Sequence, residues 1–204
     1  MNNSLVLAES CILLAGSISN ATDNAQIDKA HHFVDALVKE VINAGGSFVA
    51  YFAAEPVNAD QKPLLFDWTV ARTIDQVLPN ESSKPRLKIV ASFDRLKTKA
   101  NSEQRQLLNG MIARGVAELI PLEEEVLTGG NVGDEQIAHA TAMVVLGGGK
   151  GVTDRARKMA RKYAPVIPLD LQLGANSEDG AGALGVLSSF QTNPLTYMPF
   201  SGNA

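Results

Sequence analysis

The chain has 204 residues, of which 45% are hydrophobic and 20% are charged, and its formal net charge is −4. This length and composition favour one globular domain with a sizeable core. The acidic balance argues against a general nucleic-acid binder, which usually carries a basic face. No apolar run in the sequence is long enough for a membrane-spanning helix.

The N-terminus and the cysteine content favour a cytoplasmic protein. The first residues lack the basic stretch that opens a secretory signal, and acidic Glu9 precedes the first apolar run. The single cysteine, Cys11, cannot form an internal disulfide, which suits a reducing compartment. We interpret Cys11 as a core residue rather than a nucleophile, because buried free cysteines behave as small hydrophobic side chains.

Apolar runs alternate with helical patterns along the chain. Short apolar runs predict strands at residues 11–15, 47–52, 87–91, 116–120, 142–146 and 166–169. Apolar residues at helical spacing predict helices at residues 24–44, 64–78, 102–113, 134–141 and 152–163, with one more within 174–190. This alternation predicts an α/β fold, a Rossmann-like and mostly parallel doubly wound sheet of about six strands. Residues 1–190 are expected to form a single domain, and residues 191–204 a polar tail.

A glycine-rich turn, residues 147–151, follows the strand predicted at residues 142–146 and leads into a predicted helix. Glycines let backbone N–H groups approach an anion, and the start of a helix adds free donors and a favourable dipole. Glycine turns are also common as plain connectors. The turn alone therefore leaves phosphate binding and a structural role both open.

A second glycine-bearing turn, Gly16 and Ser17, ends the first predicted strand. In doubly wound sheets, ligands bind beyond the carboxyl ends of the strands, where the strand order reverses. We therefore expect the two turns to face each other across one crevice that holds a nucleotide or a nucleotide-derived ligand.

The segment at residues 140–152, ATAMVVLGGGKGV, resembles the signature of the SLOG superfamily. That superfamily includes the lonely-guy phosphoribohydrolases and the DNA-processing Smf/DprA proteins. Residues 15–18 look like its N-terminal Gly-Ser turn. Residues 66–68 and 130–133 look closer to the STALD branch, whose members are joined to TIR, sirtuin-like or nucleosidase effectors in anti-phage defence. The resemblance implies a sensor of nucleotide signals such as cyclic ADP-ribose isomers.

Three positions depart from the lonely-guy pattern. Val152 stands where those enzymes have Thr, Arg155 stands where they have the catalytic Glu, and their second catalytic group, an arginine, would fall near Val132. A carboxylate can serve as the acid or base in glycosidic-bond cleavage, whereas an arginine stays protonated. The resemblance thus implies a retained phosphate cradle with lost chemistry at these positions, so we assign no catalytic residue and lean away from an enzyme.

Side chains near the two turns supply further candidates for the ligand site. Arg155 can grip phosphate with two hydrogen bonds, or it can pair with Asp154 or point into solvent. Trp68 can stack on a base or pack in the core, and Glu55 can accept a ribose hydroxyl. The predicted ligand-binding residues are Gly16, Ser17, Ile18, Glu55, Trp68, Arg72, Gly147, Gly148, Gly149, Lys150, Gly151, Val152 and Arg155.

The sequence leaves three functions open. The first is a nucleotide sensor, with a TIR protein or another effector as partner. The second is a nucleotide N-glycosidase that uses another carboxylate, such as Glu55 or Asp67. The third is an oligomerisation scaffold; we expect a homo-oligomer in any case. No cofactor is expected, and no metal, because His31 and His32 are adjacent rather than four residues apart.

Overall fold

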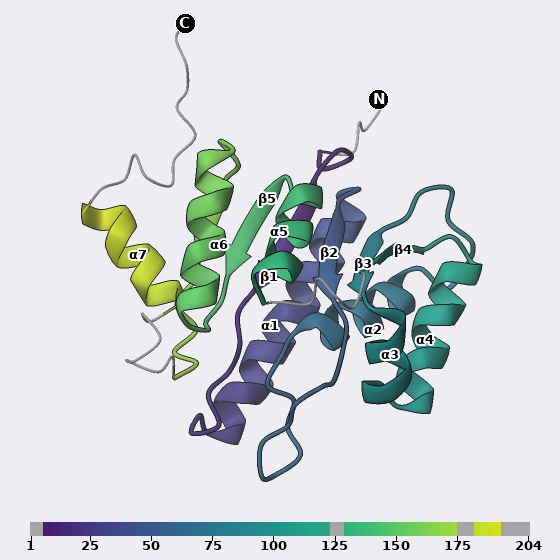
Figure 1. Cartoon of the computed structure of the whole chain (residues 1–204), viewed down its shortest axis with the longest axis horizontal. Helices are drawn as coiled ribbons and strands as arrows, with labels where there is room; N and C mark the ends of the chain where they lie inside the picture. Colours follow the sequence, from purple (N-terminus) through teal and green to yellow (C-terminus); the bar gives the residue numbers. More distant parts are fainter. Residues whose placement is uncertain (1–5, 123–128, 175–181, 193–204) are drawn as a thin grey trace, which may run out of the picture.

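The computed structural model describes residues 6–122, 129–174 and 182–192. Its centre is a six-stranded sheet in the order β4-β3-β2-β1-β5-β6 (Figure 1). Every neighbouring pair of strands is parallel. The strands are β1 (Cys11–Ala15), β2 (Ser47–Tyr51), β3 (Leu87–Ala91), β4 (Ala117–Pro121), β5 (Ala142–Val145) and β6 (Val166–Pro168). The predicted Rossmann-like α/β sheet is confirmed.

Helices cover both faces of the sheet. They are α1 (Asn24–Asn43), α2 (Asp67–Val77), α3 (Phe93–Lys99), α4 (Ser102–Ala113), α5 (Gly129–His139), α6 (Lys150–Arg161) and α7 (Gly182–Thr192). Buried residues of α1, α2 and α4 join one hydrophobic cluster, and those of α5, α6 and α7 join a second. Among the described residues, no helix is both long and apolar enough to cross a membrane.

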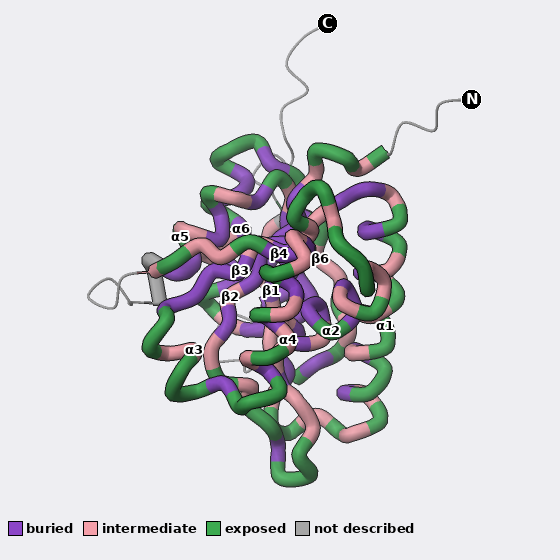
Figure 2. The backbone as a smooth tube through the Cα atoms, turned by 90° about the vertical axis from the view of Figure 1, so that its right-hand side faces the viewer, coloured by how far each residue is buried: buried purple, intermediate pink, exposed green. Residues whose placement is uncertain are grey.

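Strand β1 separates the two hydrophobic clusters at the centre of the molecule, where Figure 2 shows the buried part of the chain. Because side chains alternate along a strand, Ile12 and Leu14 enter the cluster under α1, while Cys11 and Leu13 enter the cluster under α6. All of these side chains are buried. The interpretation of Cys11 as a core residue is therefore confirmed.

Several helix bounds differ from the sequence prediction. Helix α5 begins at Gly129, before the predicted residue 134, because glycines are poor helix formers and hide a helix start in a sequence. Helix α6 begins at Lys150, inside the segment expected to be a turn. Helix α3 is missing from the sequence prediction because it has seven residues, FDRLKTK, and two apolar side chains, Phe93 and Leu96, are too few to show helical spacing. Helix α7 extends to Thr192, past the expected start of the tail, and residues 193–204 lie outside the described residues.

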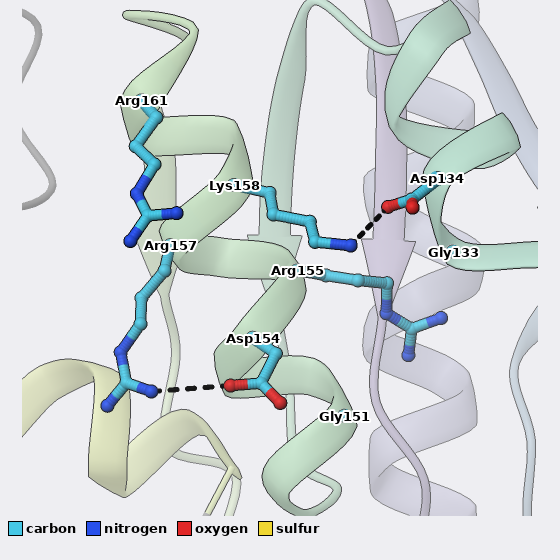
Figure 3. Close-up of a pocket in the computed structure, with 8 residues that line it drawn as sticks. All are labelled: Gly133, Asp134, Gly151, Asp154, Arg155, Arg157, Lys158 and Arg161. Carbon is cyan, nitrogen blue, oxygen red and sulfur yellow. Dashed lines mark hydrogen bonds and ion pairs between the residues drawn. The ribbon is translucent and has the colours of Figure 1, made fainter. Parts of the chain in front are cut away.

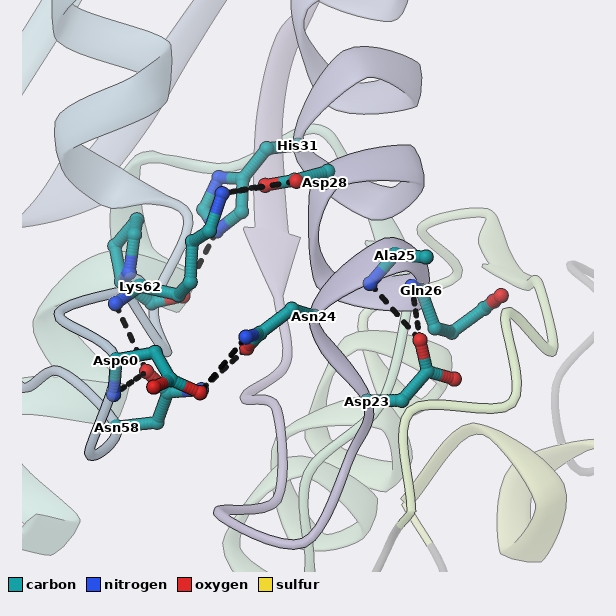
Figure 4. A network of polar contacts seen from close by, with 10 residues as sticks. Asp23, Asn24, Ala25, Gln26, Asp28, His31, Asn58, Asp60 and Lys62 are labelled. Atoms are coloured by element: carbon teal, nitrogen blue, oxygen red, sulfur yellow. Dashed lines mark hydrogen bonds and ion pairs between the residues drawn. The ribbon is translucent and has the colours of Figure 1, made fainter.

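Polar contacts hold the segment between β2 and α2, residues 52–66, against α1 (Figure 4). Lys62 Nζ pairs with Asp28 Oδ1 over 2.7 Å. His31 Nε2 donates to the carbonyl oxygen of Pro63 over 3.0 Å, and the His31 ring packs beside Phe66. These contacts fix the path of the chain into the first turn of α2.

Candidate functional site

The two glycine-bearing turns lie side by side at the point where the strand order reverses. β1 pairs with β2 on one side and with β5 on the other, so the carboxyl ends of β1 and β5 are neighbours. Beyond the strands, the backbone N–H of Gly148 donates to the carbonyl oxygen of Ser17 over 3.1 Å. The two turns are therefore neighbours in the structure, as the sequence analysis predicts.

The glycines of these turns allow two backbones to pack closely. Gly16 has a φ of +155°, and a Cβ there would lie 2.8 Å from the backbone nitrogen of Gly147. Gly148 has a φ of +82°, and a Cβ there would lie 2.7 Å from Val152 Cγ2. Both are positions that a larger residue occupies only with strain. Gly151, by contrast, has open space around its Cβ direction.

Helix α6 begins directly at the second turn. Gly149 is its N-cap residue and provides no side-chain cap, while Lys150 and Gly151 are exposed in the first turn. Val152 is buried among the side chains that α6 packs against the sheet. The helix therefore presents an uncapped, accessible start beside the joint of β1 and β5, a location that attracts anions.

Arg155, one turn into α6, points inward toward α5 and β1 (Figure 3). Its Nη1 donates to Gln136 Oε1 over 3.0 Å. Its Nε is buried and has no hydrogen-bond partner among the described residues. Burial lowers the pKa of the guanidinium, and the nearby Asp67 carboxyl raises it. Asp154, a possible partner in the sequence analysis, pairs instead with Arg157 over 3.3 Å.

An inner cavity of about 140 Å³ lies under the ends of β1 and β2. Asp67, the first residue of α2, contributes its carboxyl group, and the backbone N–H of Tyr51 donates to Asp67 Oδ1 over 3.3 Å. Burial raises the pKa of Asp67 to about 6, although Arg155 acts in the opposite direction. The lining residues are Leu14, Ala15, Gly16, Tyr51, Leu65, Asp67, Val132, Gln136 and Arg155.

An outer groove of about 490 Å³ lies between α5 and α6 (Figure 3). Lys158 pairs with Asp134 across it. Four cationic side chains and two carboxylates line the groove, so its charge is positive by two. Arg155 lines both the groove and the inner cavity and therefore connects them. The groove residues are Gly133, Asp134, Gly151, Asp154, Arg155, Arg157, Lys158 and Arg161.

Of the thirteen predicted ligand residues, Gly16, Gly151 and Arg155 line the inner cavity or the outer groove, and the other ten line neither. Four of these ten make contacts of their own elsewhere. Trp68 is 1% exposed, and its ring packs edge-on against Phe52 with the ring centroids 4.9 Å apart. The Arg72 guanidinium donates to both carboxylate oxygens of Glu55, over 3.0 and 2.6 Å. Gln104 Nε2 also donates to Glu55, over 2.7 Å. Ile18 is 5% exposed and belongs to the core under α1.

Two polar residues of the cavity, Asp67 and Gln136, are absent from the predicted ligand residues. The sequence indicates Asp67 only as an alternative acid and gives no signal for Gln136. An acidic residue at a helix start is ordinary, because it interacts well with the helix dipole. The signal that sets Asp67 apart is its burial against the end of β2, and burial of this kind depends on tertiary packing. Among the described residues, no group of three or more His, Cys, Asp or Glu side chains is arranged to hold a metal ion.

Comparison with known proteins places the chain in a family. Proteins named ATP nucleosidase Cap17, from Escherichia coli and from Escherichia coli strain KTE188, are 42% identical to it over 193 residues. The match covers 95% of this chain but 38% of each relative, so the chain spans well under half of their length.

The fold is similar to that of DNA processing protein A from Helicobacter pylori, described for its single-stranded DNA binding mode, with a TM-score of 0.51. The match covers 98% of this chain and 80% of that protein at 11% identity, so it concerns the fold alone. The family model described as "ATP nucleosidase Cap17-like, N-terminal" matches residues 7–204. The chain therefore belongs to the Cap17-like N-terminal family.

Proposed function

We propose that this chain is a nucleotide-binding domain whose ligand lies across the joint of β1 and β5, with its phosphates in the outer groove. The main support for the proposal is the position of Arg155 and the unpartnered Nε of its side chain. Its Nε is buried and has no partner among the described residues, and the side chain borders both the groove and the inner cavity. A buried donor without a partner is costly unless a ligand or solvent satisfies it.

Three further features support the proposal. The groove carries an excess of two positive charges, the uncapped start of α6 adjoins it, and the site lies where ligands bind in doubly wound sheets. The name of the relatives makes adenine nucleotides the first ligands to test.

A cyclic ADP-ribose-type signal, a STALD-like link to an effector in anti-phage defence and a homo-oligomeric assembly all belong to the same proposal. The domain would then act as a sensor, and its output would come from a partner or from the remainder of a longer protein.

Calorimetric titration with ATP, ADP, AMP, adenosine, ADP-ribose and cyclic ADP-ribose tests the proposal. We expect phosphorylated ligands to bind and adenosine to bind far more weakly. Arg155→Gln should weaken binding about 10- to 100-fold, since a charge-assisted hydrogen bond contributes about 1.5–3 kcal/mol. Lys84→Gln, which removes an exposed cation outside the groove, is the control and should bind like the wild type. If no phosphorylated ligand binds to the folded chain, the proposal fails.

A second candidate function is cleavage of the N-glycosidic bond of a nucleotide. Asp67 favours it, because a carboxyl group with a pKa of about 6 can donate a proton to a leaving base near neutral pH. Release of free adenine from ATP by the purified chain would support this function, and Asp67→Asn should abolish the release. If ATP binds and stays intact over hours, the chain is a binding domain rather than a nucleosidase.

A further inference from the structure

We propose that the inner cavity is a ribose subsite, in which Asp67 accepts hydrogen bonds from the ribose hydroxyls while Arg155 and Gln136 donate to them. This inference rests on the proposed nucleotide-binding function and adds a ligand class to it. The site would select ribonucleotides over deoxyribonucleotides.

The size of the cavity suits a sugar rather than a whole nucleotide. Its volume is about 140 Å³, whereas sites for complete drug-sized ligands measure about 300–1,000 Å³. Water occupies about 30 Å³ per molecule in the liquid, so the cavity takes a group the size of a few waters, such as a pentose ring. The outer groove, which shares Arg155 with the cavity, is large enough for phosphates.

The charged side chains also indicate that the inner cavity holds the sugar and the outer groove holds the phosphates. The cavity holds one carboxyl group, Asp67, and one guanidinium, Arg155, so their charges balance when both are ionised. A phosphate placed there would face the Asp67 carboxylate, whereas a neutral hydroxylated group would not. With Arg155 counted in the cavity, the groove still has three cationic side chains and two carboxylates, so it keeps an excess of one positive charge and is the better place for phosphate.

The donors and acceptors in the cavity match hydroxyl groups, which donate and accept at once. The Asp67 carboxylate accepts from the Tyr51 N–H and keeps further acceptor capacity, because an ionised carboxylate has two acceptor oxygens. Among the described residues, Arg155 Nε has no partner, and the Gln136 amide nitrogen donates no hydrogen bond. Leu14 and Leu65 provide an apolar wall for the C–H face of a sugar.

Asp67 also has the protonation state that this role needs. A pKa of about 6 leaves it mainly ionised at pH 7.5, so it can accept from two hydroxyls. Glu55, the acidic residue that the sequence placed after β2 for this task, already holds Arg72 and Gln104. Asp67 is therefore the carboxylate with free acceptor capacity at the cavity.

The experiment compares ATP, 2′-deoxyATP and 3′-deoxyATP by calorimetry at pH 7.5 on the 204-residue chain. We expect at least one deoxy form to bind about 10- to 100-fold more weakly than ATP, since the lost bond is to a charged group. Asp67→Asn should remove most of this discrimination by weakening ATP and leaving the deoxy form nearly unchanged. Gln136→Leu, which also removes a donor from the cavity, should reduce the discrimination as well.

The control variant is Asp75→Asn, which lies on the same helix, α2, and pairs with Arg114 outside the cavity. It should retain the wild-type ratio between ATP and the deoxy forms. Equal binding of ATP and both deoxy forms by the wild type would overturn the ribose subsite while leaving nucleotide binding intact. Discrimination that survives in both cavity variants would also overturn it. If no nucleotide binds at all, the proposed function itself fails.

Discussion

Replacing Asp67 with asparagine should stabilise the unliganded protein at neutral pH. The pKa of Asp67 rises from 3.8 to about 6 on folding, so above pH 6 the folded state bears the cost of keeping a buried carboxylate ionised. One pKa unit corresponds to about 1.4 kcal/mol, which gives about 3 kcal/mol. Asparagine also loses a favourable charge at the start of α2, worth about 0.3–1 kcal/mol. A net gain of about 2 kcal/mol remains.

Urea denaturation of the wild type and Asp67→Asn at pH 7.5 and pH 4 measures this effect. Between pH 3.8 and 6 the folded state binds more protons than the unfolded state, so this contribution to wild-type stability falls as the pH rises. The advantage of the variant should therefore be about 2 kcal/mol at pH 7.5, or roughly 4–8 °C in Tm for a chain of this size, and most of it should disappear by pH 4. A variant that is no more stable than the wild type at pH 7.5, or whose gain persists unchanged at pH 4, would refute the reasoning.

Three other changes test the structure around the site. Gly16→Ala should destabilise the fold by about 1–3 kcal/mol, since its Cβ would meet the backbone of Gly147. Gly151→Ala should be neutral or stabilising in thermal melts, because residue 151 has open space in the first turn of α6. Equal effects of the two substitutions on stability would contradict the packing of the turns. Burial lowers the pKa of His31 in the folded state. The stability that neutral His31 contributes is therefore lost as the pH falls below 6.5, and His31→Gln should flatten that part of a stability-versus-pH curve. Glu55→Gln should lower the unfolding free energy by about 1–3 kcal/mol in urea titrations, because it weakens the half-buried pair with Arg72; an unchanged midpoint would show that the pair contributes nothing.

The sequence was sufficient to predict the sheet and the meeting of the two turns. Apolar runs and glycine turns are local signals, and the alternation of strands and helices fixes which strand ends share an edge. The centre of the candidate site was harder to predict. Whether Trp68 faces a ligand or Phe52, and whether Glu55 is free or held by Arg72, depends on how α2 and α4 pack on the sheet. The unusual environment of Asp67 arises from the same packing.

The pairing of β1 with β5 has a consequence for how the protein folds. The backbone N–H of Cys11 donates to Thr141 Oγ1 over 2.8 Å, although 130 residues separate the two in sequence. The contact between the two turns therefore forms only when the first and last thirds of the chain have met, and contacts between residues so far apart in sequence form slowly. A ligand bound there would stabilise the folded chain as a whole. Hydrogen exchange should then slow in β1 and β5 together, and separately expressed halves of the domain should have no ligand affinity.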